Sequence, residues 1–178
     1  KVYATPGDYH IKVNITQSRE VTNFRFNNAG DRLKLIDIRN WGWARFQLGN
    51  NFHGCTNLGY ITAKDMPTGL TNMLSFFEGC TSFTGGLKLS DWDTSAVTNM
   101  SRTFLNNPLF NQVLNWNTSN VTTMSKMFGG AIAFNQLVNF DTAKVTDMSF
   151  MFLLASNFNQ SVSSFNTSQV TAMNYMFA

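Results

Sequence analysis

The sequence predicts a repeat solenoid in which each coil contributes one short parallel β-strand and one helical or 3-10 turn. Two observations carry this prediction. The phrase VTNMSRTF at Val97–Phe104 returns as VTTMSKMF, VTDMSFMF and VTAMNYMF, the last ending at Phe177. A second set of matched positions fills the intervals between these copies. A unit this short cannot bury both of its faces alone, so successive copies are expected to stack and cover one another.

The period of the repeat is set by the phenylalanine that ends the phrase. These anchors are separated by 25, 27, 24, 24 and 25 residues, at Phe52, Phe77, Phe104, Phe128, Phe152 and Phe177. Six residues after each of the first five anchors comes a second apolar position, filled by Leu58, Phe83, Phe110, Phe134 and Phe158. Both sets are expected to form the core of the stack, together with the methionines of the phrase, Met100, Met124, Met148 and Met173.

Alternation predicts the strand of each coil. In FNQLVNFDT, the apolar residues Val138 and Phe140 lie two residues apart, as they do on one face of a strand. The equivalent segments are expected to pair in parallel about 4.8 Å apart, and they are Leu87–Leu89, Leu114–Trp116, Val138–Phe140 and Val162–Ser164.

The phrase itself predicts a helical turn. Val145, Met148 and Phe152 are three or four residues apart, which is the spacing of one face of a helix. One short strand and one helical or 3-10 turn per coil is the plan of a leucine-rich repeat, and the fold is therefore expected to be leucine-rich-repeat-like.

The first 40 residues predict a small N-terminal β cap, and residues 41–178 predict the solenoid, with five to six coils and an incomplete last one. Strands are expected within Pro6–Ile15 and Val21–Phe26, because apolar and polar side chains alternate there. The stretch LKLIDIRNWG then predicts a first, degenerate coil. The end of a solenoid exposes apolar surface, so the open coil at Ala178 is expected to accept further repeats or a neighbouring subunit.

Composition predicts an extracellular protein that neither binds nucleic acid nor inserts into a membrane. Charged residues make up 13% of the chain, against roughly 25% in a typical globular protein. Residues 1–45 hold eight Lys/Arg and four Asp/Glu, a net charge of +4, whereas residues 46–178 hold five and six, a net charge of −1. The repeats therefore lack the basic face of a nucleic-acid-binding protein. No apolar run reaches about 18 residues, the length that a membrane span requires.

The unit FNQxVxxWNTSxVTxMSxMFxxA resembles the BspA-type leucine-rich repeats of bacterial surface proteins, over roughly Trp41 to Phe177. The earlier stretches FHGCTNL and FEGCTSF resemble the more general form of that repeat. The resemblance implies a right-handed solenoid of short parallel strands and an extracellular or cell-surface location, among adhesins and antigens. Related repeats also occur in phage and protist proteins, so a virion surface is the alternative location.

Two columns of residues are expected to be structural. Cys55 and Cys80 share a position that later units fill with Asn107, Ala131 and Ala155. We expect buried free thiols, with a disulfide as the alternative, because stacked Cα atoms about 5 Å apart lie within bonding range. The second column consists of asparagines that are each followed by Gln. Their amides are expected to bond along the stack, with presentation to a ligand as the alternative, and they are Asn111, Asn135 and Asn159.

The functional prediction is a binding module that is not an enzyme and uses no cofactor or metal. The chain has two His and ten acidic residues, without a G-x-S-x-G motif or a phosphate-binding loop. A surface-exposed or secreted adhesion module for a protein or glycan is the leading interpretation. A structural spacer or assembly component of a cell-surface or virion appendage is the alternative. The candidate ligand-binding residues are the exposed strand positions and three aromatic residues: Lys88, Asn115, Asn139, Ser163, Trp41, Trp43 and Tyr60.

Overall fold

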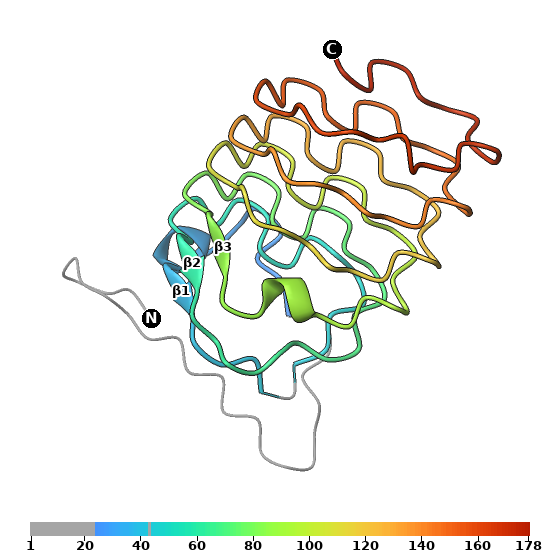
Figure 1. Ribbon diagram of the computed structural model, residues 1–178. Coiled ribbons are helices and arrows are strands. Elements are labelled where there is room, and N and C mark those ends of the chain that lie inside the picture. The colour runs from blue at the N-terminus through green and yellow to red at the C-terminus, as the bar shows by residue number, and fades with distance from the viewer. Residues whose placement is uncertain (1–23, 43) are drawn as a thin grey trace.

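The computed structural model describes residues 24–42 and 44–178. The predicted strand within Pro6–Ile15 and most of the one at Val21–Phe26 lie outside the described residues, as does Trp43. In Figure 1 the chain passes through successive loops that lie side by side in sequence order.

Regular secondary structure is confined to the first part of the described chain. The elements are η1 (Arg32–Lys34), β1 (Asp37–Ile38), β2 (Tyr60–Ile61), β3 (Gly85–Gly86) and η2 (Leu89–Asp91). The three strands form one small parallel sheet in the order β1-β2-β3 (Figure 1). Asp37 pairs with Tyr60, which pairs with Gly85, so each strand comes from the next unit of the repeat.

A glutamine side chain follows β3 where a fourth strand would otherwise pair. The Gln112 Oε1 accepts a hydrogen bond from the Gly86 amide at 2.8 Å, and its Nε2 donates to the Gly86 carbonyl at 2.9 Å. The side-chain amide therefore makes the two bonds that a neighbouring backbone would make. Gly86 is required at this point, because a Cβ there would lie 2.8 Å from the Cβ of Ile61.

The predicted strand positions are wrong, although the parallel pairing of successive units is present. No strand is assigned at the four predicted segments, all of which are described: β3 precedes the first of them, and Leu89 begins η2. Parallel bridges instead join successive copies of the phrase, from Asn72 to Asn99, Thr123, Asp147 and Ala172. The alternation of Leu114, Asn115 and Trp116 reflects burial of an extended chain, with the two apolar residues at most 5% exposed.

The predicted helical turn in the phrase is also wrong, because the phrase forms overlapping turns joined to the next unit. Alternate backbone amides donate to carbonyls of the next unit, with N···O distances of 2.8–2.9 Å: Met148 to Ala172, Phe150 to Asn174 and Phe152 to Met176. The intervening amides close turns within the unit, as Met151 does on Met148 at 3.2 Å. The φ angle of 59° at Phe150 is incompatible with a right-handed helix. A series of such turns produces the same apolar spacing as a helix.

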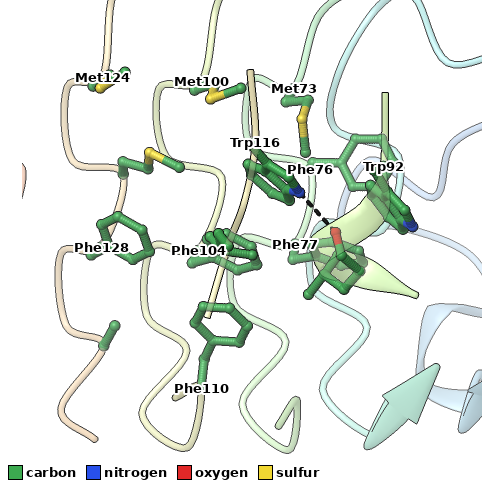
Figure 2. Close-up of a cluster of buried hydrophobic side chains, with 14 of the residues drawn as sticks. Met73, Phe76, Phe77, Trp92, Met100, Phe104, Phe110, Trp116, Met124 and Phe128 are labelled. Atoms are coloured by element: carbon green, nitrogen blue, oxygen red, sulfur yellow. Dashed lines mark hydrogen bonds between the residues drawn. The ribbon is translucent and has the colours of Figure 1, made fainter. Parts of the chain in front are cut away.

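The core consists of aromatic rings stacked from one unit to the next (Figure 2). Centroids of successive anchor rings, from Phe52 to Phe177, lie 5.6–5.8 Å apart. The phenylalanines six residues after the anchors stack in the same way, from Phe83 to Phe158, with centroids 5.8–5.9 Å apart. Met100, Met124 and Met148 are fully buried, whereas Met173 in the last unit is 41% exposed.

Residues just before β1 already take part in this stacking. The amides of Phe26 and Asn28 donate to the carbonyls of Asn51 and His53. The rings of Phe24 and Phe26 each lie 6.4 Å from the ring of Phe52. The described part of the predicted cap thus covers the first anchor phenylalanine with aromatic side chains.

Candidate interaction surface

One column of residues in the turns of the phrase ranges from the buried Ser75 to the exposed Arg102 and Tyr175. It lies two residues before each anchor phenylalanine, and all its members have left-handed φ angles, between 51° and 59°. We call this set the outer column: Asn50, Ser75, Arg102, Lys126, Phe150 and Tyr175.

The residue types of the outer column are not those that its backbone prefers. A left-handed conformation costs an L-residue roughly 1–2 kcal/mol, and glycine or asparagine adopts it most readily. The other left-handed column of the phrase follows this preference in four of five units, with Gly54, Gly79, Asn106, Gly130 and then Leu154. The last four members of the outer column instead retain large side chains, which indicates a role for those side chains beyond backbone geometry.

The large side chains of the outer column contact one another. The Lys126 Nζ lies 5.0 Å from the centroid of the Phe150 ring, a cation–π contact. The Phe150 and Tyr175 rings stack with centroids 5.4 Å apart and an interplanar angle of 15°. Arg102 is exposed and Tyr175 is 65% exposed, whereas Lys126 and Phe150 are half-buried. Their order along the stack is two cations followed by two aromatic rings.

Positive charge in residues 97–178 gathers on the phrase and the residue just before it. The three Lys/Arg residues of this range are Arg102, Lys126 and Lys144. The Lys144 Nζ donates to the Asn120 Oδ1 at 2.6 Å. The parallel bridges that join successive copies of the phrase form a ladder, and Asp147 is one of the two acidic residues in this range and lies on that ladder. Its Oδ1 accepts the Ser149 amide at 2.8 Å. The outer column itself contains no acidic residue.

The predicted aromatic ligand contacts are partly wrong. Trp41 is 5% exposed, and its ring packs edge-on against Phe46, Phe52 and Trp92 at 5.2–5.7 Å. Trp41 is buried because these three rings pack around its indole. Tyr60, on β2, is 39% exposed.

The four predicted polar positions are exposed but lie on a different segment from the ladder: Lys88, Asn115, Asn139 and Ser163. The Lys88 Nζ forms an ion pair with Asp91 at 3.1 Å, and the Ser163 Oγ lies 2.9 Å from the Ser161 Oγ. The outer column was missed because the phrase was interpreted as an inward-facing helical turn. Its signal was the variable letter before M-F or T-F, which reads R, K, F and Y in the four quoted copies.

The asparagine column bonds along the stack, as its structural interpretation predicted. The Asn111 Oδ1 accepts the Asn135 amide and the Gln136 Nε2, both at 2.9 Å. The Asn135 Oδ1 accepts the Asn159 amide and the Gln160 Nε2 at 2.9 and 3.0 Å. These amides are engaged by the next unit.

The two cysteines are free and fully buried. The Cys80 Sγ lies 3.1 Å from the Phe52 carbonyl oxygen. Burial raises the pKa of Cys55 to about 12 against the opposing effect of Arg32, and burial also raises the pKa of Cys80 well above its ordinary value. Protonated, inaccessible thiols are poor nucleophiles.

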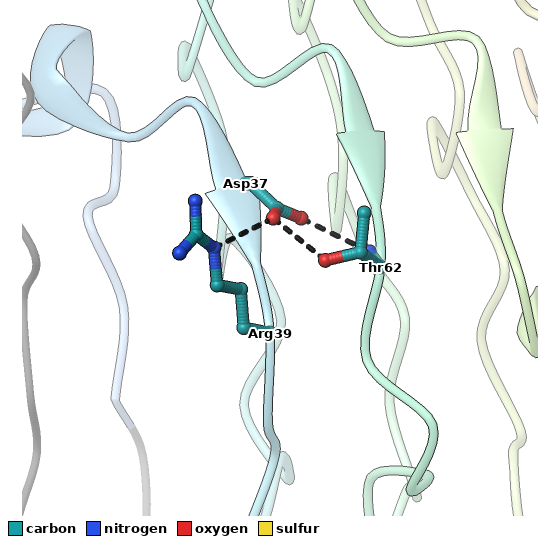
Figure 3. A network of polar contacts seen from close by, with 3 residues as sticks. All are labelled: Asp37, Arg39 and Thr62. Atoms are coloured by element: carbon teal, nitrogen blue, oxygen red, sulfur yellow. Dashed lines mark hydrogen bonds and ion pairs between the residues drawn. The ribbon is translucent and has the colours of Figure 1, made fainter.

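A polar network connects β1 to the residue that follows β2 (Figure 3). The Asp37 carboxylate accepts the Thr62 amide at 3.0 Å and the Thr62 hydroxyl at 2.6 Å, and it contacts the Arg39 Nε at 3.2 Å. Partial burial alone would raise the pKa of Asp37, but the Thr62 hydrogen bonds and the Arg39 charge lower it. The network joins two units and leaves Asp37 ionised.

Residues 24–42 and 44–178 contain no group of three or more His, Cys, Asp or Glu side chains that could hold a metal ion. The same residues contain no helix long and apolar enough to cross a membrane.

Comparison with known proteins identifies the family. Residues 71–178 match the family described as "Mycoplasma protein of unknown function, DUF285". The chain belongs to the DUF285 family. DUF285 lies in the context of BspA-like repeat surface proteins, to which the sequence motifs also pointed. No curated protein and no solved structure matches the chain. The DUF285 match includes the last five members of the outer column, from Ser75 to Tyr175.

Proposed function

We propose that this DUF285 protein is a non-enzymatic binding module, exposed on a cell surface or secreted, that recognises a protein or glycan through side chains displayed on a leucine-rich-repeat-like solenoid. The supporting observation is the outer column, where Arg102, Lys126, Phe150 and Tyr175 occupy left-handed positions. Glycine would adopt these positions at lower cost.

The backbone beneath the outer column is suited to holding a binding surface in a fixed geometry. The amides of Arg102, Lys126 and Phe150 donate to carbonyls of the following unit at 2.9 Å. The adjacent anchor residues Phe104 and Phe128 are fully buried. A rigid framework lowers the entropic cost of binding, because few backbone torsions must be fixed when a ligand binds.

A binding assay tests this proposal. The purified protein is applied to immobilised extracellular-matrix proteins and to a glycan array. It is compared with a variant in which Arg102, Lys126, Phe150 and Tyr175 are all replaced by Ser, the residue that unit two carries at Ser75 with a φ of 51°. We expect the wild type to bind at least one target and the variant to lose that binding while its melting temperature is maintained.

The alternative is a structural spacer or assembly component of a cell-surface or virion appendage. The direct bonding of successive units favours it, since backbone amides of one unit donate to carbonyls of the next, as Phe128 does to Met151 at 2.9 Å. A spacer requires no displayed side chains, so equal behaviour of the wild type and the serine variant in every binding assay would favour this alternative.

A further inference from the structure

The order of residues along the outer column specifies the chemistry of a ligand, if the column is the binding surface proposed above. Arg102 and Lys126 come from adjacent units whose backbones are joined by the Arg102 N–H···O=C Ser125 bond at 2.9 Å. The exposed Arg102 can bind a carboxylate through two parallel hydrogen bonds. Lys126 places a second cation one unit farther along the column, over the Phe150 ring.

Phe150 presents no free ring face to a sugar, whereas Tyr175 stacks on Phe150 through one face and is 65% exposed. Phe150 has Lys126 over one face and Tyr175 stacked on the other, with centroids 5.0 and 5.4 Å from the cation and the second ring. Sugars bind aromatic residues mainly through ring faces, and neither face of Phe150 is free. The outward edges of Phe150 and Tyr175 remain, and ring edges suit the edge-to-face packing of another aromatic or an aliphatic side chain.

We propose that the outer column binds an acidic polypeptide segment, with carboxylates at Arg102 and Lys126 and an aromatic or aliphatic side chain against the edges of Phe150 and Tyr175. Charge complementarity supports this ligand, because the column carries two cations and no acidic residue. Two cations are too few to neutralise the several phosphates that a nucleic acid presents.

Selection from a random peptide library on the immobilised full chain identifies the preferred partner chemistry. We expect enrichment of peptides in which Asp or Glu accompanies an aromatic or aliphatic residue. Enrichment without acidic residues would overturn the proposal. Binding of a soluble polyuronate, a linear acidic glycan, with the same dependence on Arg102 and Lys126 would also overturn it and assign the column to a glycan.

Variants of the two halves of the column then test the contacts of one selected peptide. R102S/K126S and F150S/Y175S should each weaken its binding by about tenfold or more, as loss of central interface contacts does. The matched control is Asn106→Gly, in the other left-handed column, where Asn106 has the same φ of 58° as Arg102 and Lys126. It should leave the affinity unchanged. Equal losses in the control and the two double variants would show a general effect on the ladder and overturn the proposal.

The stability of one further variant, Lys126→Gly, separates this inference from a structural role of the column. A side chain that only displays contacts should be replaceable without loss of stability, so Lys126→Gly is expected to maintain or raise the melting temperature while weakening peptide binding. A lowered melting temperature for K126G, with unchanged peptide affinity, would assign Lys126 to the framework. If acidic peptides are not selected but the matrix or glycan assay depends on the column, the partner chemistry is wrong and the proposed binding function stands.

Discussion

At the scale of single residues, the energetic contribution of an anchor phenylalanine depends on how many neighbouring units cover it. Phe128 is fully buried, with Phe104 and Phe152 stacked on its two sides at 5.7 and 5.6 Å. Phe177 stacks on Phe152 at 5.6 Å but is 59% exposed. Identical residues in one column therefore make different contributions to stability.

Truncation of these two rings should show the difference. Phe128→Ala is expected to lower the free energy of unfolding by about 3–5 kcal/mol, the usual range for a buried phenylalanine. Phe177→Ala should cost clearly less, because much of its ring already contacts solvent. Denaturant titration of both variants measures this, and equal losses would contradict the proposed dependence on neighbouring units.

The buried thiols predict a dependence of stability on alkaline pH. Burial raises the pKa of Cys55 to about 12 and raises that of Cys80 as well, so the folded protein keeps protons that the unfolded chain releases near its ordinary thiol pKa of 9.0. Their contribution to stability is complete below that value. Above it, the free energy of unfolding should fall by about 1.4 kcal/mol per pH unit for each thiol until the folded pKa is reached.

The control for the thiol prediction is the double variant Cys55→Ala/Cys80→Ala, which introduces the residue found at Ala131 and Ala155 of the same column. It retains every Lys and Tyr, so the difference between its pH profile and that of the wild type isolates the thiols. Parallel profiles between pH 9 and 11 would mean that the thiols titrate freely. A thiol reagent should also leave the folded wild type unlabelled and react with both cysteines after the protein is unfolded.

At the scale of the element, the overlapping turns of the phrase require glycine where the chain has left-handed φ and a close neighbour. Gly130 has a φ of 68°, and a Cβ there would lie 2.8 Å from the Asn106 Oδ1. Gly59 has no atom within 4 Å of such a Cβ and no left-handed φ. Only the first position is constrained by the geometry of the turn.

Alanine substitutions at these two glycines compare constrained and unconstrained positions. Gly130→Ala should lower the free energy of unfolding by roughly 1–2 kcal/mol from its left-handed backbone alone, with a further loss from the contact with Asn106. Gly59→Ala should be neutral or stabilising by up to about 1 kcal/mol, since it restricts the unfolded chain. Thermal melts of the two variants provide the measurement. A G130A protein as stable as G59A would show that the turns tolerate an ordinary residue.

At the scale of the whole molecule, charge is distributed so that long-range attraction contributes little to binding. In the described portion of the basic N-terminal part, from residue 24 on, two cations are paired with acids: Lys34 with Asp31 at 2.9 Å and Arg39 with Asp37 at 3.2 Å. Residues 46–178 carry a net charge of −1. Exposed charges are screened within about 8–10 Å at physiological salt.

Ligand binding should therefore weaken only modestly when the salt concentration rises several-fold. With two cations in the outer column, we expect a loss of about tenfold or less, far smaller than that of proteins which neutralise many phosphates. Isothermal titration of a selected ligand at low and high salt measures the effect. Tight binding to heparin that disappears in about 0.5 M salt would instead indicate that a polyanion is recognised. Charge-reversal at Arg25 and Arg39 would then locate that site in the N-terminal part.

The sequence by itself determined the repeat period, the apolar columns, and the bonding of the asparagine amides along the stack. These follow from spacing, because similar residues that recur every 24–27 residues make the same contact in successive units. Tertiary structure decided where the ladder lies and which side chains face outward. Turns with alternating backbone conformations give Val145, Met148 and Phe152 the spacing of a helix, so periodicity alone could not distinguish the two. Burial of Trp41 likewise depends on three rings brought to it by other units.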